Sequence, residues 1–128
     1  METVEKNLLD LGFAEVVRTD ENKLTVTVPK EHLYETARRL RYESDEVFDY
    51  LIDIVGMDYG DALGVIYYLS PSENPAHVLV LKTSTLDREQ PELFSVCDLW
   101  DSASVYEREV YDFFGIRFIN HQIGRAHV

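Results

Sequence analysis

Three carboxylates and a guanidinium stand within six positions late in the sequence, in the stretch YEREVYDFFGIRFINH. They belong to Glu107, Arg108, Glu109 and Asp112, and His121 ends the stretch. Clustered carboxylates with a histidine could bind a divalent metal ion or act as general acid and base. A guanidinium among acids could instead be held in a planar, bidentate ion pair. The element that carries these residues decides among the possibilities.

The spacing predicts a short amphipathic helix under these residues. Ser104 and Glu107 have the Ser-x-x-Glu spacing of a capping box, which marks a helix start. Gly115 suits a C-terminal cap, and the following IRFIN returns to extended alternation. Residues at i, i+4 and i+7 form an apolar stripe that we expect to face the core, namely Tyr106, Val110 and Phe113.

Helical geometry argues against an active site made by this helix alone. Residues turn by about 100° each, so Glu107 and Glu109 point to nearly opposite sides. Arg108 and Asp112 are neighbours at i, i+4, as are Glu109 and Asp112 at i, i+3. Glu109, Asp112 and His121 could hold a metal ion, but metal–carboxylate bundles draw ligands from several helices. The sequence has no second ligand-rich segment.

Other reactive groups are few. Cys97 is the single cysteine, so the chain can form neither an intrachain disulfide nor a cysteine cluster site on its own. No Gly-x-Ser-x-Gly elbow and no glycine-rich phosphate loop occurs. The aromatics near the charged stretch exceed what one helix face can bury, which indicates a protein–protein interface. They are Trp100, Tyr106, Tyr111, Phe113, Phe114 and Phe118.

Composition indicates a single soluble domain. The 128 residues are 45% apolar, enough for one core, and a formal charge of -12 disfavours nucleic acid and anionic lipid. The longest apolar run, LGVIYYL, is far shorter than the roughly 20 residues that span a bilayer. The first residues lack the pattern of a signal peptide. We expect a cytoplasmic protein that reaches a membrane only through a partner.

The elements that position the charged stretch follow from periodicity. The pattern predicts an α+β fold with two layers, in the order α-β-β-α-β-β-β with a C-terminal amphipathic helix. We expect a mixed sheet with helices on one face, and short turns that make the last three strands an antiparallel meander. The predicted helices are residues 2–11, 30–43 and 104–114, and the predicted strands are 13–18, 23–29, 48–59, 63–70 and 76–85.

The charged stretch resembles the signature of the C subunit of NADH:quinone oxidoreductase, or respiratory complex I. That signature runs Glu-Arg-Glu, one or two residues, an acid, two apolar residues, Gly-Ile, an aromatic and a His. Upstream, DIVGMDY, GVIYYLSPSENPAHVLVLK and FSVCDLWDSA resemble further family segments in order, so the similarity covers about residues 45–121. The signature residues are Glu107, Arg108, Glu109, Asp112, Phe113, Phe114, Gly115, Ile116, Phe118 and His121.

The resemblance implies a non-catalytic scaffold in the peripheral arm of a proton-translocating NADH:quinone oxidoreductase, an enzyme subunit without an active site of its own. It would pack on the large, hydrogenase-like quinone-pocket subunit beside iron–sulfur subunits, on the cytoplasmic side of the cell inner membrane. Iron–sulfur clusters, FMN, NADH and quinone would be bound by those partners. We then expect a structural ion-pair network of Glu107, Arg108, Glu109 and Asp112 and a partner interface of Tyr111, Phe114, Phe118 and His121.

Two departures from the family pattern stand in the sequence. Val105 occupies a position where the family often has tryptophan. After His121 the family continues with proline, an acid, paired arginines and a long tail, whereas this sequence ends QIGRAHV. IGRAHV is what one reading frame of a common sequencing-library adapter encodes. We therefore expect one domain over residues 1–121 and a non-native or atypical tail over 122–128.

Two alternatives stay open at this point. The equivalent subunit of a membrane-bound energy-converting hydrogenase carries a similar pattern. A stand-alone metal-dependent hydrolase using Glu109, Asp112 and His121 is an alternative of another class, and it predicts stoichiometric metal in the purified protein.

Overall fold

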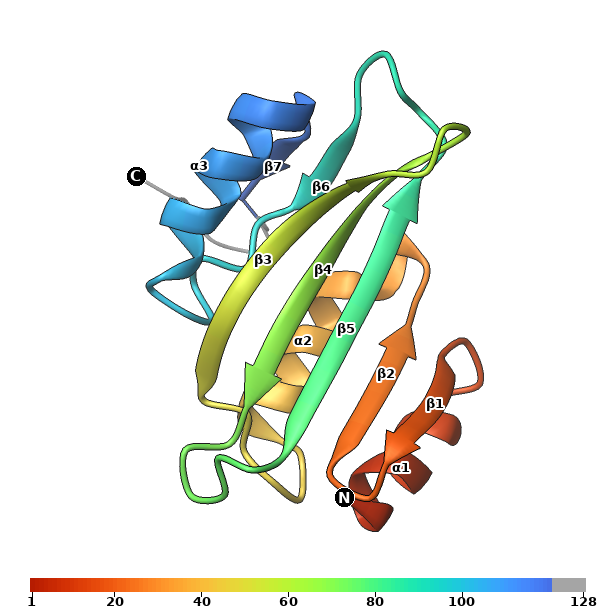
Figure 1. Cartoon of the computed structure of the whole chain (residues 1–128), viewed down its shortest axis with the longest axis vertical. Coiled ribbons are helices and arrows are strands. Elements are labelled where there is room, and N and C mark those ends of the chain that lie inside the picture. The colour runs from red at the N-terminus through yellow and green to blue at the C-terminus, as the bar shows by residue number, and fades with distance from the viewer. Residues whose placement is uncertain (121–128) are drawn as a thin grey trace.

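The fold is α+β, as a computed structural model describes for residues 1–120 (Figure 1). His121 and the tail expected over 122–128 lie outside the described residues. Three α-helices and a 3-10 turn alternate with strands. The helices are α1 (Glu2–Leu9), α2 (Leu33–Tyr42) and α3 (Ala103–Phe114), with the 3-10 turn η1 (Lys30–His32) leading into α2. The strands are β1 (Glu15–Asp20), β2 (Lys23–Thr27), β3 (Tyr50–Asp58), β4 (Leu63–Ser70), β5 (Val78–Thr85), β6 (Glu92–Phe94) and β7 (Arg117–Ile119).

Five strands form one mixed sheet in the order β1-β2-β5-β4-β3. β3, β4 and β5 make the antiparallel meander that the short turns predict, while β2 pairs with β5 in parallel. The α+β class with a mixed sheet is therefore confirmed. Successive side chains of a strand point to opposite faces, so directly paired residues share a face. Ile54, Tyr67, Leu81 and Val26 form one such row across four strands.

The core lies between this row and the helices. Ile54, Tyr67, Leu81 and Val26 are at most 4% exposed. Figure 1 shows α2 behind the sheet, and the three helices contribute their apolar sides to the same core. The helix residues buried there are Val4 and Leu8 of α1, Leu33, Ala37 and Leu40 of α2, and Ala103 and Val110 of α3. None of the helices described in residues 1–120 is long and apolar enough to cross a membrane.

The short strand β6 departs from the sequence prediction, which gives no strand between residue 85 and the C-terminal helix, whereas β7 lies within IRFIN, where extended alternation is expected. β6 and β7 pair in parallel, with Leu93 opposite Phe118, in a separate two-stranded sheet. The pairing extends past both ends, because Arg117 donates its N–H to the carbonyl of Pro91 at 2.9 Å and Ser95 donates to Ile119 at 2.7 Å. The three residues of β6 are too few to show a periodicity, so tertiary pairing and not local pattern makes this strand.

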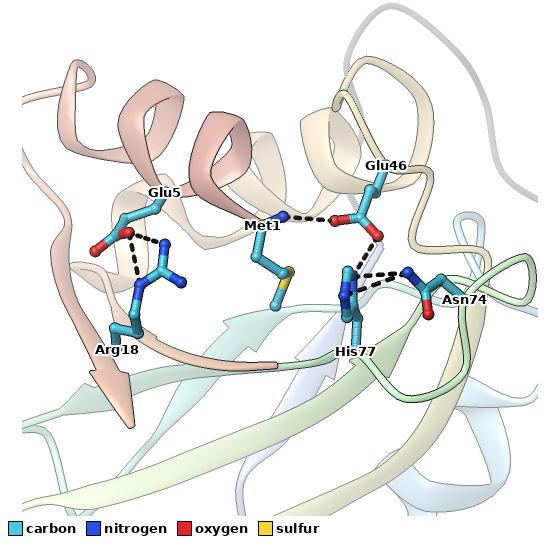
Figure 2. Close-up of polar contacts among 6 residues, drawn as sticks. All are labelled: Met1, Glu5, Arg18, Glu46, Asn74 and His77. Atoms are coloured by element: carbon cyan, nitrogen blue, oxygen red, sulfur yellow. Dashed lines mark hydrogen bonds and ion pairs between the residues drawn. The ribbon is translucent and has the colours of Figure 1, made fainter. Parts of the chain in front are cut away.

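Polar contacts tie the first helix to the sheet (Figure 2). The Nε of Arg18 on β1 donates to the Glu5 carboxylate of α1 at 3.1 Å. Glu46, in the segment that leads into β3, contacts the Met1 amino group at 3.2 Å and the His77 Nδ1 at 2.6 Å. These contacts join the chain start, the loop before β3 and the loop before β5 at one end of the molecule.

Candidate functional site

The helix α3 is seated on the edge strand β3 by a glycine. A Cβ atom built on Gly56 would lie 2.5 Å from Cδ2 of Phe114, a separation that real Cβ contacts do not show. The half-buried ring of Phe114 therefore rests directly on the backbone of β3. At the following residue Gly115 adopts φ 74° and ends the helix in the left-handed conformation. These two glycines fix where α3 lies and where it stops.

A buried carboxylate on the same inward side fastens α3 to the segment after β6. Glu107 is 5% exposed. Its Oε1 accepts from the Ser95 hydroxyl at 2.6 Å, and its Oε2 accepts from the Val96 N–H at 2.9 Å. The Ser95 Oγ in turn accepts from the Cys97 N–H at 3.1 Å. Burial raises the pKa of Glu107, and the hydrogen bonds from Ser95 and Val96 oppose that rise.

The predicted capping box is therefore wrong. The helix begins at Ala103, its N-cap residue Ser102 makes no side-chain cap hydrogen bond, and Ser104 Oγ contacts the Asp101 carbonyl at 3.4 Å. Glu107 is turned inward and its oxygens are occupied by Ser95 and Val96. Glu107 makes the tertiary contact in place of the local capping interaction, because the buried Val96 N–H would otherwise lack an acceptor, which is costly.

The buried stripe of α3 also differs in phase from the prediction. The residues that face the sheet are Ala103, Glu107, Val110 and Phe114, at i, i+4, i+7 and i+11. Phe113, predicted as part of the core, is 83% exposed. A glutamate in the inward stripe hides the true phase, since a charged residue at a core position reads as a break in the apolar pattern. The Ser-Val of FSVCDLW, which supplies both donors to Glu107, gives no sequence signal for this pairing.

A second buried polar group lies close to this carboxylate. Tyr67 of β4 is 1% exposed, and within the described residues its hydroxyl has no hydrogen-bond partner. Burial raises the pKa of Tyr67 well above its ordinary value, and the charge of Glu107 adds to the rise. The interior beneath α3 therefore favours neutral side chains at both positions.

The remaining charged residues of the helix lie on its solvent side. Arg108 and Asp112 form an ion pair at 3.8 Å, and both are more than half exposed. Glu109 is exposed as well. Of the four residues predicted as one network, the structure brings together Arg108 and Asp112 and places Glu107 on the buried side. Exposed ion pairs of this kind typically contribute less than about 1 kcal/mol to the free energy of unfolding. The contacts that fix α3 on the sheet are therefore those of Glu107 and Phe114.

The described part of the chain gives no support to a metal centre on this helix. Among residues 1–120, no group of three or more His, Cys, Asp or Glu side chains is arranged to hold a metal ion. Glu109 and Asp112 point into solvent, and His121 lies outside the described residues.

Aromatic side chains are exposed beside the fixed part of α3. Tyr111 is 49% exposed and Phe113 83% exposed, whereas Phe118 of β7 is half-buried. Between α3 and β7 lies a hollow of about 380 Å³, lined among others by Tyr111, Phe118, Arg108 and Arg117. Of the predicted interface residues, Tyr111 and Phe118 meet at this hollow, and Phe114 lies against β3 instead. We name Arg108, Tyr111 and Phe118 the α3–β7 surface; Phe113, two residues after Tyr111 on the helix, points to nearly the opposite side and does not line the hollow.

Replacing Gly56 with alanine tests how α3 is seated. We expect the free energy of unfolding to fall by about 1–3 kcal/mol, because the new methyl forces the Phe114 ring aside in a packed contact. Urea unfolding of the single variants and of the double variant with Phe114→Ala measures the coupling between the sites. The alanine at position 56 should cost much less once the ring is gone. Equal costs in both backgrounds would contradict the close approach.

Comparisons with known proteins agree on one family. Residues 26–126 match the family model described as "Respiratory-chain NADH dehydrogenase, 30 Kd subunit". The C/D subunit of the NADH-quinone oxidoreductase of Phocaeicola vulgatus is 44% identical over 75% of this chain and 18% of its own length. The C subunit of the NADH-quinone oxidoreductase of Albidiferax ferrireducens is 37% identical over 92% of this chain and 61% of its own length. The chain thus spans less than two thirds of either relative.

Two solved structures share the fold. One, titled "Nqo5 of the trypsin-resistant fragment (1-134)", has a TM-score of 0.76 at 28% identity and covers 99% of this chain and 98% of its own. The other is a chain from the membrane-bound sulfane sulfur reductase, an archaeal respiratory membrane complex. Its TM-score is 0.80 at 24% identity, over 99% of this chain and 75% of its own, which shows the fold alone.

Proposed function

The chain belongs to the family of the 30 kDa subunit of the respiratory-chain NADH dehydrogenase, and from this premise we propose that it is a scaffold subunit of a proton-translocating NADH:quinone oxidoreductase. Its place is the peripheral arm, on the cytoplasmic side of the cell inner membrane. The reaction of the complex is electron transfer from NADH to quinone. This chain contributes to it by packing and not by chemistry.

The observation that carries the proposal is the contrast between the two sides of α3. One side is fixed by the Gly56–Phe114 contact and by the hydrogen bonds to Glu107. The solvent side presents the exposed ring of Tyr111 next to Arg108 and the hollow. Aromatic and arginine side chains on a rigid support are the usual anchors of protein interfaces. Because α3 is fixed on its inner side and exposes an aromatic ring and an arginine on its outer side, it is better suited to be a docking surface than an active site.

The proposed partner of the α3–β7 surface is the large, hydrogenase-like subunit that forms the quinone pocket. Relatives named as C/D subunits support this choice, since in the protein of Phocaeicola vulgatus the matched part makes up 18% of a much longer chain. A C part and a D part on one polypeptide remain close together by necessity. Neighbouring iron–sulfur subunits complete the surroundings. Iron–sulfur clusters, FMN, NADH and quinone are assigned to these partners, and no cofactor is assigned to this chain.

Replacing Arg108 and Tyr111 with alanine together tests the proposal, because both side chains line the hollow. The chain is co-expressed with the large quinone-pocket subunit from the same source, which corresponds to the D part of the C/D relatives and is called the D-type subunit below. The mixture is separated by size-exclusion chromatography, and the Kd of the two proteins is measured by titration. We expect one-to-one co-elution for the unmodified chain and at least a roughly tenfold weaker Kd for the double variant, because truncating an interface anchor typically costs over about 1 kcal/mol.

The control is Leu86→Ser, which removes an exposed apolar side chain, 79% exposed, after β5 and away from the α3–β7 surface. It should leave binding unchanged. Separate elution of the unmodified chain would refute the scaffold role. Equal affinity of the double variant and the control would place the contact elsewhere on the molecule.

The equivalent subunit of a membrane-bound energy-converting hydrogenase remains the second candidate. The fold is shared with a chain of an archaeal sulfane sulfur reductase complex, so fold alone does not separate related respiratory assemblies. Competition resolves this point: D-type subunits from an NADH:quinone oxidoreductase and from an energy-converting hydrogenase are offered together to the tagged chain. Preference for the hydrogenase subunit would favour the second candidate.

A further inference from the structure

The face of the sheet opposite the helices carries an apolar patch. Figure 1 looks onto this face, with α2 behind the strands. Val55 and Ile66 are directly paired there, and Tyr68 and Val80 lie in the adjacent row, between Asp53 on β3 and Thr25 on β2. Val80 is 5% exposed and Val55, Ile66 and Tyr68 are half-buried, although no helix described in residues 1–120 covers them. With Lys82, which is paired with Ile66, these residues make up what we call the outer face.

The strand sequences themselves mark this face for burial. An antiparallel sheet with one solvated face normally alternates apolar and polar residues, whereas a strand buried on both faces reads as a continuous apolar run. β4 reads LGVIYYLS and β5 begins VLVL, so the central strands lack the alternation. In β2, by contrast, Leu24 and Val26 alternate with Lys23, Thr25 and Thr27. The apolar residues of the outer face are therefore confined to the centre of the sheet.

Within the described residues, a lysine stands at the β2 edge of this patch without a counterion. Lys82 is half-buried, and its direct neighbours across the strands are Ile66 and Thr27. Within residues 1–120 its ammonium forms no ion pair and no hydrogen bond. Yet the chain has 24 acidic against 12 basic residues, and exposed arginines elsewhere find acids, as Arg88 does with Asp58 at 2.7 Å. The Lys82 ammonium is therefore placed to form an ion pair with a carboxylate of another protein.

We propose that the outer face is a second docking surface, occupied by a subunit of the same complex that presents an apolar surface with one carboxylate placed against Lys82. This inference rests on the proposed function only in placing the chain in a multisubunit complex. The occupant is a different subunit from the one on α3, because α3 packs on the opposite face of the sheet. The chain then bridges two neighbours, one on each face.

A protein occupant is favoured over a lipid surface by charge. A single ammonium cannot hold a chain of net charge -12 on an anionic bilayer, since the remaining acids are repelled. It can form one desolvated ion pair inside an apolar contact, where the lysine stem packs along its neighbours and the ammonium meets a fixed acid. A flat sheet face with one such pair also sets the register of the partner.

Carbodiimide coupling in the intact complex tests the proposal. This reagent joins a lysine amine to a carboxylate in contact with it, with loss of water. The complex is purified through a tag on this chain, treated, digested and analysed by mass spectrometry. We expect an amide between Lys82 and an Asp or Glu of a subunit other than the D-type one. A link to the D-type subunit, to a second copy or within this chain would overturn the assignment, as would the absence of any link at Lys82.

Acetylation of surface amines gives a second readout that does not depend on coupling geometry. Lys82 should react at least roughly tenfold less in the complex than in the free chain, whereas Lys6 on α1 should react equally in both. Equal reactivity of Lys82 in both states would overturn the proposal.

The variant Lys82→Glu separates this surface from the α3–β7 surface. It should keep its melting temperature, because Lys82 has no polar partner within residues 1–120. It should still bind the D-type subunit with unchanged affinity while losing at least roughly tenfold in recovery of the second subunit. The control Lys23→Glu changes a lysine at the margin of the same face and should recover both subunits. Recovery of both by Lys82→Glu would refute the second surface and leave the scaffold role standing.

Discussion

Replacing Trp100 with alanine is expected to lower the free energy of unfolding by about 3–5 kcal/mol, the usual range for removing a buried tryptophan. Trp100 is 5% exposed, and its Nε1–H donates to the carbonyl of Phe48 at 3.0 Å. Its loss would leave a large cavity and a buried carbonyl without this donor. Since Trp100 stands three residues before α3, we also expect the helix to lose its fixed place on the sheet.

Urea unfolding followed by far-UV circular dichroism measures this effect, and Trp100→Phe is the matched variant. Phenylalanine fills most of the space but has no N–H, so its cost should fall to about 1–3 kcal/mol. The difference between the two variants separates packing from the hydrogen bond. Loss of less than about 1 kcal/mol in Trp100→Ala would show that the segment before α3 does not anchor the fold.

Replacing Glu107 with alanine is expected to cost about 2–4 kcal/mol, because the Ser95 hydroxyl and the Val96 N–H both lose their acceptor in a buried place. Loosening this segment also frees β7, whose Ile119 carbonyl accepts from the Ser95 N–H at 2.7 Å. Hydrogen exchange at the Val96 and Ser95 amides should therefore rise more than exchange in the central strands. Protection that stays at the level of the unmodified chain would contradict the role of Glu107.

Comparing the unmodified chain with the variant Glu107→Gln isolates the pH dependence of the stability that Glu107 contributes. Burial raises the pKa of Glu107 above its ordinary value of 4.5, so between these two values the folded state binds more protons than the unfolded state. The contribution of Glu107 to stability is then complete below about pH 4.5 and is lost as pH rises through the raised pKa. Glutamine stays neutral throughout. The unmodified chain should therefore gain stability relative to Glu107→Gln as pH is lowered from about 8 to about 4.

The comparison with Glu107→Gln is needed because other carboxylates act in the opposite direction. The hydrogen bond from Arg88 lowers the pKa of Asp58 to about 2. Asp58 therefore stabilises the folded state at pH values above its pKa in the unfolded chain, and this stabilisation is lost as the pH falls through its pKa in the folded chain. Asp58 is present in both proteins, so its effect cancels in the difference between them. A difference that is constant over this pH range would show that Glu107 is not perturbed by burial.

Periodicity predicted the elements of this fold well where they are long. The alternation of Leu24, Val26 and Val28 and the stripe of Leu33, Ala37 and Leu40 both point into the core, as the burial of these residues shows. The pattern did not predict β6, because three residues carry no period and its partner β7 lies beyond α3. Nor does local sequence indicate which strand β2 joins, since its partner β5 is far along the chain.

The candidate site was predicted in part. The segment that the sequence singled out contains Glu107, which is buried against Ser95, and Arg108 and Tyr111, which line the hollow between α3 and β7. The sequence analysis assigned Glu107 to a structural ion-pair network with Arg108, Glu109 and Asp112, because helical spacing describes one helix and contains no information on Ser95 and Val96. It placed Phe113 inside and expected Phe114 at the partner, whereas the glycine at position 56 selects Phe114 for the sheet. A glycine inside an otherwise apolar strand was the available signal for this close approach.

The parallel pairing of β2 with β5 has a consequence for how the chain folds. β3, β4 and β5 pair with their immediate neighbours in sequence, so they need only short loop closures and form quickly. The β1–β2 hairpin closes locally as well, but it joins the sheet only by bringing Lys23 opposite Val78. During synthesis this hairpin leaves the ribosome first and docks late, with one strand edge unpaired until β5 arrives. That edge is where a nascent chain is most exposed to pairing with another copy, so slow translation between β2 and β5 should promote aggregation.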